Sequence, residues 1–134
     1  TKLVDRQPEL GMIIDHIAKP KAQKGLVEHE WRSGMKELAK RENILGVKFS
    51  GLATEFPKED EIDPDTIRAY FEETLEIFGV ERVMFGTDWP VCLLRLDSYK
   101  QWADTLIILT SSLSGDEKDL ILKKNGETAY QLKS

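Results

Sequence analysis

The sequence predicts an α/β fold built on a parallel sheet. Three short apolar segments, residues 12–15, 46–50 and 82–86, have the composition of buried strands. None is followed by a hairpin turn, and more than about 25 residues separate each from the next, which leaves room for a crossover helix. Helical patterns fill these intervals. The resulting order, β-α-β-α-β-α-α, is typical of parallel strands with helices packed against them.

The first two expected helices occupy residues 28–41 and 65–78. In both, apolar side chains recur at helical spacing. The second opens on Asp-Pro-Asp at residues 63–65 and ends at Gly79, which are favoured residues at the two ends of a helix. The acidic loop before it, residues 53–63, is expected to be either a solvated loop or a lid over a site.

Two further helices are expected after the third strand. Residues 98–112 place apolar side chains in phase along one face. Ser114 and Glu117 form an S-x-x-E capping box, which opens the last helix. We expect Asn125–Gly126 to interrupt that helix.

Composition and charge exclude several classes of protein. The 134 residues suit one domain, and 40% of them are hydrophobic. The net charge of −5 argues against a nucleic-acid partner, since phosphate binding needs clustered Lys and Arg. No apolar run approaches the roughly 18 to 20 residues that span a bilayer, and the N-terminus lacks a signal-peptide pattern. The single cysteine, Cys92, cannot form an intrachain disulfide, so a cytoplasmic location is expected.

Polar side chains follow each predicted strand. Side chains at the carboxyl ends of parallel strands converge on one rim, so His16, Ser50 and Asp88 are expected to lie together. Histidine and aspartate suit general acid-base chemistry, an oxyanion donor or a metal ligand. The alternatives are a hydrogen-bonded structural histidine and an aspartate that caps a turn. Two histidines without a cysteine cluster cannot complete a zinc site in this chain.

Neighbouring residues offer further candidates. Lys19 could hold an anionic group of a substrate, or could be a solvated loop lysine. Trp89 could line a pocket or only pack. Asp15, as the last residue of the first expected strand, is expected to point to the face opposite His16 and to have a structural role. Cys92 lacks a basic partner and is expected to be a buried thiol, and His29 is expected to be exposed.

Three stretches resemble strand ends in the C-terminal half of the amidohydrolase-related proteins. They are "MIIDHIAKP", "NILGVKFSGL" and "GVERVMFGTDWPVCLL", and the similarity is closest to the lactone-hydrolysing branch. The final "NGETAYQL" resembles the closing helix of that family, with Gly126 where alanine is common. The resemblance implies that residues 1–134 are a single partial-barrel domain. They would supply the sixth to eighth strands of a TIM (β/α)8 barrel.

The resemblance also implies roles. Asp88 would act as general base for the attacking water and His16 would stabilise developing negative charge, while Lys19, Trp89 and Ser50 would contact a small-molecule lactone. The family's His-x-His pair is absent, so His16 and Asp88 could bind a divalent metal (Zn or Mn) only with ligands from an N-terminal half. Whether a metal is needed stays open. We expect this chain alone to be inactive and to form a homo-oligomer through exposed strand edges. The alternatives are a metal-dependent decarboxylase and a non-catalytic partner-binding domain.

Overall fold

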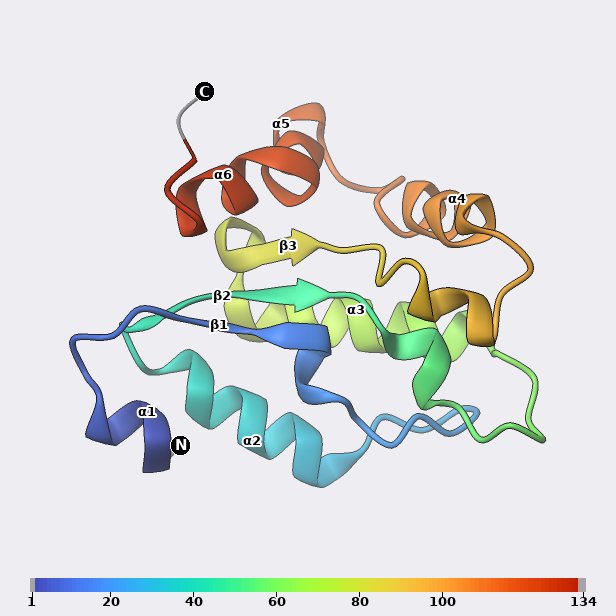
Figure 1. The fold of residues 1–134 in the computed structure, drawn as a ribbon, viewed down its shortest axis with the longest axis horizontal. Helices are drawn as coiled ribbons and strands as arrows, with labels where there is room; N and C mark the ends of the chain where they lie inside the picture. Colours follow the sequence, from blue (N-terminus) through green and yellow to red (C-terminus); the bar gives the residue numbers. More distant parts are fainter. Residues whose placement is uncertain (1, 133–134) are drawn as a thin grey trace.

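The structure, a computed structural model that describes residues 2–132, contains the predicted parallel sheet. Its strands are β1 (Met12–Ile14), β2 (Ile44–Phe49) and β3 (Val83–Phe85), in the order β1-β2-β3 (Figure 1). The prediction of three parallel strands is confirmed. β2 begins two residues earlier than expected, and β1 ends at Ile14, one residue earlier than expected. The early end of β1 changes the geometry of the functional rim.

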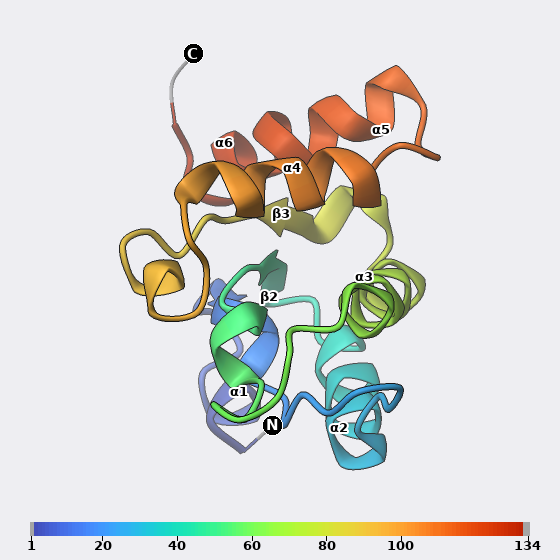
Figure 2. The same ribbon diagram turned by 90° about the vertical axis from the view of Figure 1, so that its right-hand side faces the viewer.

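The predicted helices are present: α2 (His29–Ala39) and α4 (Tyr99–Leu109) are slightly shorter than predicted, and α3 (Pro64–Phe78) begins one residue earlier. The Asp63 side chain caps α3 by accepting a hydrogen bond from the backbone N–H of Thr66, and Pro64 opens the first turn. A short helix that the sequence did not predict, α1 (Lys2–Arg6), precedes β1. Figure 2 shows α2 and α3 on one side of the sheet and α4 beside β3.

The C-terminal helix is continuous, so the interruption expected at Asn125–Gly126 is wrong. It runs through α5 (Gly115–Asp119), the π-helical η5 (Leu120–Lys124) and α6 (Asn125–Ala129). The predicted capping box of Ser114 and Glu117 is confirmed by both of its hydrogen bonds. Asn125 has helical backbone angles, and its buried amide donates 2.7 Å hydrogen bonds to the carbonyls of Val80 and Val83. A residue that looked like a helix breaker instead joins the helix to the start of β3.

Replacing Asn125 by Ala should destabilise the chain. The substitution removes both hydrogen bonds and leaves two carbonyls unpaired near β3, which we expect to lower the free energy of unfolding by about 1–3 kcal/mol. Urea unfolding followed by circular dichroism measures the change. The control is Lys124→Ala, because the neighbouring Lys124 is exposed and has only a surface ion pair with Asp119. Equal stability of the two variants would contradict this role.

The core lies between β2 and the helices. Val47 and Phe49 are fully buried, and the Phe49 ring packs edge-on against Phe71, with centroids 5.1 Å apart. On its other side Phe49 stacks with Trp102, at 6.4 Å. Because side chains alternate along a strand, Lys48 projects from the opposite side of β2. The sheet therefore has an apolar face against the helices and a face that carries polar side chains.

The loop expected at residues 53–63 packs in part against the rest of the chain. It begins with η2 (Leu52–Glu55), and Phe56 is buried. The Arg95 guanidinium donates hydrogen bonds to the carbonyls of Phe56, Pro57 and Asp60. Residues 58–61 are exposed, as expected for a solvated loop. The lid alternative stays a prediction.

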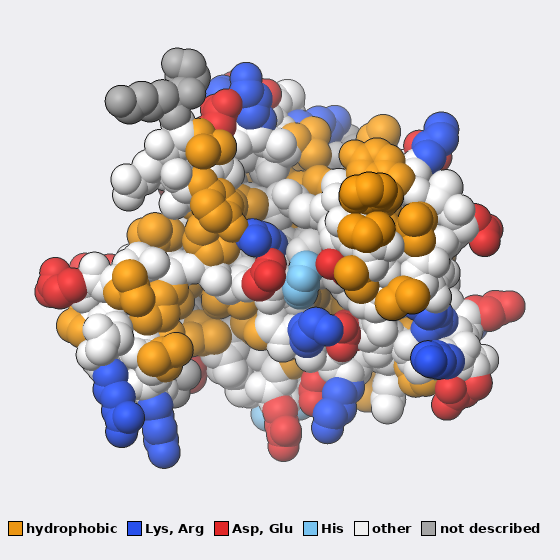
Figure 3. Space-filling view, viewed as in Figure 1, with side chains coloured by type: hydrophobic (Ala, Val, Ile, Leu, Met, Phe, Trp, Pro, Cys, Tyr) orange, Lys and Arg blue, Asp and Glu red, His pale blue; other side chains and the backbone are white. Residues whose placement is uncertain are grey.

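The face of the sheet away from α2 and α3 is partly open to solvent: the Lys48 side chain is 30% exposed, whereas Met84 is buried. Figure 3 shows a histidine near the centre of the visible face, flanked by acidic and basic side chains, with hydrophobic side chains on both sides. β1 and β3 each pair with β2 on one side only. Within residues 2–132, no helix has the length and apolar character that crossing a membrane requires.

Candidate active site

His16 is positioned by a left-handed turn directly after β1. The turn η1 (Asp15–Ala18) has positive φ at His16, Ile17 and Ala18, with values of 47°, 43° and 59°. Such angles are costly for residues with a side chain, so surrounding contacts must maintain them. Ile17 is fully buried, and its carbonyl accepts a 2.6 Å hydrogen bond from the Trp31 indole. These contacts anchor the turn and leave the His16 ring at the rim.

The structure brings His16, Ser50 and Asp88 together, as expected. His16 Nδ1 lies 2.8 Å from Ser50 Oγ, and His16 Nε2 lies 3.5 Å from Asp88 Oδ1. The His16 side chain is 27% exposed and that of Asp88 is 12% exposed, whereas Ser50 is 1% exposed. His16 and Asp88 are therefore reachable from solvent, and the buried Ser50 contacts the His16 ring.

Two glycines make room for this arrangement. A Cβ atom at Gly51, which has φ +69°, would lie 2.9 Å from His16 Cγ. A Cβ atom at Gly86 would lie 3.0 Å from Ser50 Cβ. Since real Cβ atoms rarely approach other heavy atoms so closely, side chains at these two positions would displace His16 and Ser50. Both glycines were visible in the sequence just after a strand, but nothing there indicated what they accommodate.

Asp15 does not point away from His16, so that expectation is wrong. Because β1 ends at Ile14, strand alternation does not govern Asp15. Its Oδ2 lies 3.5 Å from His16 Nε2, and its Oδ1 lies 3.1 Å from Lys48 Nζ. Burial acts to raise the pKa of Asp15, but the hydrogen bond from Lys48 and the nearby charges outweigh it and lower that pKa. Asp15 is thus a second carboxylate beside the imidazole.

Two lysines at the rim are paired with acids. Lys19 Nζ lies 2.9 Å from Glu55, and that carboxylate raises the pKa of Lys19, with a smaller contribution from the charge of Asp88. The neighbouring Tyr130, whose ring centroid lies 5.5 Å from Lys48 Nζ, followed by the contact with Asp15, raises the pKa of Lys48. The sequence interpretation missed Lys48 and Glu55. Lys48 could have been found, because a lysine between two apolar residues of a predicted strand is unusual. Glu55 could not, because the sequence does not distinguish it from the other acidic residues of its loop.

Asp88 and Trp89 lie in the loop after β3. The alternative that the Asp88 carboxylate caps a helical turn is wrong, because η4 (Val91–Leu94) has no side-chain cap. Only the backbone carbonyl of Asp88 bonds to this turn, by accepting a 2.9 Å hydrogen bond from the N–H of Cys92. The carboxylate is therefore free to face His16. Trp89 is 63% exposed, which does not fit a purely packing role. Cys92 is buried and His29 is exposed, as predicted.

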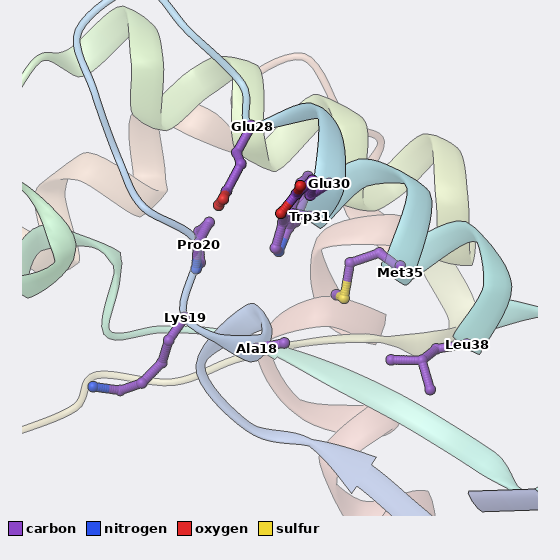
Figure 4. A pocket seen from close by; sticks show the side chains of 9 residues that line it. Ala18, Lys19, Pro20, Glu28, Glu30, Trp31, Met35 and Leu38 are labelled. Atoms are coloured by element: carbon purple, nitrogen blue, oxygen red, sulfur yellow. The ribbon is translucent and has the colours of Figure 1, made fainter. Parts of the chain in front are cut away.

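A separate pocket lies behind the rim, between the turn after β1 and α2. It encloses about 220 Å³, and its lining includes Pro20, Trp31, Met35 and Leu38. Figure 4 shows the Lys19 ammonium pointing away from this pocket, consistent with its ion pair to Glu55. His16 and Asp88 do not line it. The candidate site is therefore the open rim and not this pocket.

Comparison with known proteins identifies the family. A sequence profile of the amidohydrolases matches residues 1–132. The chain belongs to the amidohydrolase family. The three strands and their helices correspond to part of the amidohydrolase barrel: an amidohydrolase from Burkholderia multivorans, solved with bound zinc, superposes with a TM-score of 0.89 at 30% identity. That match covers 98% of this chain and 48% of the other.

Two relatives of this amidohydrolase chain are L-fucono-1,5-lactonases. The lactonase of Burkholderia ambifaria is 38% identical over 101 residues, which cover 72% of this chain and 33% of the relative. The lactonase of Burkholderia multivorans is 34% identical over 139 residues, which cover 90% of this chain and 43% of the relative. The amidohydrolase chain thus spans less than half the length of either lactonase.

The rim does not by itself fit a metal ion. His16 Nε2 and one oxygen each of Asp15 and Asp88 come close together, but no group of three or more His, Cys, Asp or Glu side chains within residues 2–132 is arranged to hold a metal. A catalytic zinc site needs three protein ligands. The expectation that His16 and Asp88 could bind a metal only with ligands from another segment stays a prediction, and no chemical step below depends on a metal.

Proposed function

We propose that this amidohydrolase chain supplies part of the active site of a lactone hydrolase, with a cyclic ester of a sugar acid as the substrate. The observation that carries the proposal is the approach of His16 Nε2 to within 3.5 Å of Asp88 Oδ1 at the rim. Two lactonase relatives at 38% and 34% identity support the type of substrate.

Asp88 is the proposed general base. The Asp88 side chain is 12% exposed, so a water molecule can reach it. Its carboxylate does not cap η4. Asp88 takes a proton from water as the water oxygen attacks the lactone carbonyl and forms the new C–O bond. The ring C–O bond then breaks, and the proton held by Asp88 can pass to the departing alkoxide. The product is an open-chain hydroxy acid.

His16 is the proposed donor to the oxygen that becomes negative. An N–H aimed at a developing oxyanion stabilises the transition state more than the ground state. Lys19 lies three residues after His16, and the exposed Trp89 directly follows Asp88, so their side chains would contact the rest of the substrate. Since Lys19 is already paired with Glu55, an anionic substrate group would have to compete with that carboxylate for it.

The experiment uses a complete barrel, which we define as a polypeptide that joins residues 1–134 to the five preceding strands of the family fold. The preceding segment is taken from the Burkholderia multivorans lactonase. Sugar-acid 1,5-lactones are offered at neutral pH, and proton release is recorded. We expect saturable hydrolysis. Release of CO2 from a carboxylic acid substrate without lactone hydrolysis would favour the decarboxylase alternative. No turnover of either kind by a folded barrel would favour a binding domain.

The isolated chain is proposed to self-associate. β1 pairs with another strand on one side only, whereas on β3 the Val83 carbonyl is already bonded to Asn125, and open strand edges promote pairing with another chain. The large apolar residues Leu10 and Leu45 are also exposed, at 56% and 41%. Sedimentation equilibrium at tens of micromolar should give about twice the 15.3 kDa mass of one chain. Ile13→Lys on β1 should weaken the dimer, and a strictly monomeric profile of the unchanged protein would contradict it.

A further inference from the structure

The contacts of His16 point to a function for Ser50 that differs from the substrate contact first expected. We propose that Ser50 is a positioning residue that holds neutral His16 in the tautomer with its proton on Nε2. In this arrangement Ser50 donates its hydroxyl proton to His16 Nδ1, and His16 presents an N–H to the rim. The use of that N–H in hydrolysis rests on the proposed function, whereas the tautomer does not.

Ser50 is buried, and its hydroxyl contacts the His16 ring. Ser50 is 1% exposed, and its Oγ lies 2.8 Å from His16 Nδ1, the normal distance for a hydrogen bond. A substrate could not reach this hydroxyl without displacing the ring. In a neutral imidazole one nitrogen is a donor and the other an acceptor, so the contact permits two tautomers. The groups next to Nε2, on the opposite side of the ring, determine which of the two tautomers is favoured.

Two carboxylates on that side favour a proton on Nε2. Oxygens of Asp15 and Asp88 each lie 3.5 Å from His16 Nε2. A lone pair at Nε2 would face two negative groups, whereas an N–H places its positive end toward them. Lys48 offsets part of the Asp15 charge from 3.1 Å. The Asp88 carboxylate forms no ion pair with Lys or Arg within residues 2–132, so its charge acts directly on the ring.

Two glycines let the backbone pack closely against the His16 ring and Ser50. Gly51 lies against the ring, where even a Cβ atom would be 2.9 Å from Nδ1. A Cβ atom at Gly86 would lie 3.0 Å from the Ser50 Cβ. The two glycines therefore leave room for the hydroxyl and the imidazole to lie side by side. Ser50→Ala would remove only the hydroxyl and leave Nδ1 without its partner.

In this tautomer, neutral His16 is already a hydrogen-bond donor at Nε2. An Nε2–H can stabilise an oxyanion or a leaving oxygen without first acquiring a proton. Supplying an Nε2 lone pair instead would require the ring proton to move to Nδ1 and the Ser50 hydroxyl to rotate and become an acceptor. The two carboxylates thus favour the donor function of His16 over a function as base or ligand at Nε2, and the Ser50 hydroxyl supports it by donating to Nδ1.

Nuclear magnetic resonance of the 134-residue chain tests the tautomer without any measurement of activity. The chain contains two histidines, so His29→Gln leaves His16 as the only imidazole. The protein is labelled with 15N-histidine and kept in EDTA above about pH 8, where an ordinary imidazole is neutral. Long-range 1H–15N correlation spectra then show which ring nitrogen carries the proton. We expect Nε2–H to dominate, and a dominant Nδ1–H form would overturn the proposal.

Variants at Ser50 complete the test. Ser50→Ala should shift His16 toward a mixture of tautomers, while Ser111→Ala, a matched change at an exposed serine, should leave the spectrum unchanged. Ser50→Cys retains a weak donor and should restore part of the Nε2–H signal. Identical His16 spectra for the unchanged chain and Ser50→Ala would overturn the proposal. If Ser50→Ala does not fold, the spectrum of the unchanged chain and that of Ser50→Cys still decide it.

A complete barrel separates this proposal from the proposed function. Ser50→Ala should lower kcat for lactone hydrolysis by about 10-fold, with KM little changed, because Ser50 acts through His16 and does not touch the substrate. A rise in KM at constant kcat would instead indicate substrate contact and contradict the proposal. Absence of lactone hydrolysis in the unchanged barrel would remove the proposed function and leave the tautomer measurement intact.

Discussion

Replacing Asp88 by Asn in a complete barrel is expected to lower kcat/KM for lactone hydrolysis by about 10²–10⁴-fold. General bases typically contribute this much, and an amide cannot take a proton from water. Asparagine has nearly the same shape as aspartate, so packing around a side chain that is only 12% exposed should be preserved. The loss should appear mainly in kcat, because the carboxylate is needed for the attack of water more than for substrate binding. Initial rates from proton release, at several lactone concentrations, provide both constants.

The matched control for Asp88 is Asp104→Asn. Asp104 is an exposed acid on α4 whose carboxylate pairs with Lys100 one helical turn away. The same chemical change there should leave kcat/KM within about twofold, since an exposed pair contributes little. Retention of near-normal activity by Asp88→Asn would show that another group activates the water.

Replacing Phe49 by Ala is expected to have the largest effect on stability. Phe49 is fully buried in β2, between Phe71 and Trp102, and truncation of such a ring typically costs about 3–5 kcal/mol. Small domains have only about 5–15 kcal/mol of stability in total, so much of the chain should unfold at room temperature. Thermal unfolding followed by circular dichroism and by Trp fluorescence measures this.

An exposed apolar residue serves as the control for Phe49. Leu94 in η4 is 77% exposed, and Leu94→Ala should change the free energy of unfolding by no more than about 0.5 kcal/mol. A similar small change for Phe49→Ala would mean that β2 is not the centre of the core, and the layer arrangement would need revision.

Much of the fold followed from local patterns in the sequence. Short apolar segments separated by long helical intervals can form parallel strands, and the structure places β1, β2 and β3 in chain order. The Ser114–Glu117 pattern carries its own hydrogen-bonding partners, so the cap was predictable. The unexpected continuity at Asn125 depends on the carbonyls of Val80 and Val83, more than 40 residues away in sequence. Local propensity contains no information about such distant partners.

The rim was predictable only in outline. Convergence of strand ends brought His16, Ser50 and Asp88 together, because parallel strands end at one edge. The position of Asp15 depended on β1 ending one residue earlier, and a shift of one residue changes which way a side chain points. The burial of Ser50 and the pairing of Lys19 with Glu55 arise from tertiary packing of separate loops. Those features required the structure.

A direct comparison of lactone hydrolysis by the complete barrel and by residues 1–134 alone tests the central claim. Both proteins are purified, shown to be folded by circular dichroism, and offered the same sugar-acid 1,5-lactone at equal concentration. The proposed function predicts saturable hydrolysis by the complete barrel and only the uncatalysed rate with the chain alone, because three strands provide one part of an eight-stranded rim. Lactone left intact by a folded complete barrel would contradict the proposed function. Hydrolysis by the chain alone at the rate of the barrel would show that residues 1–134 already contain the whole site.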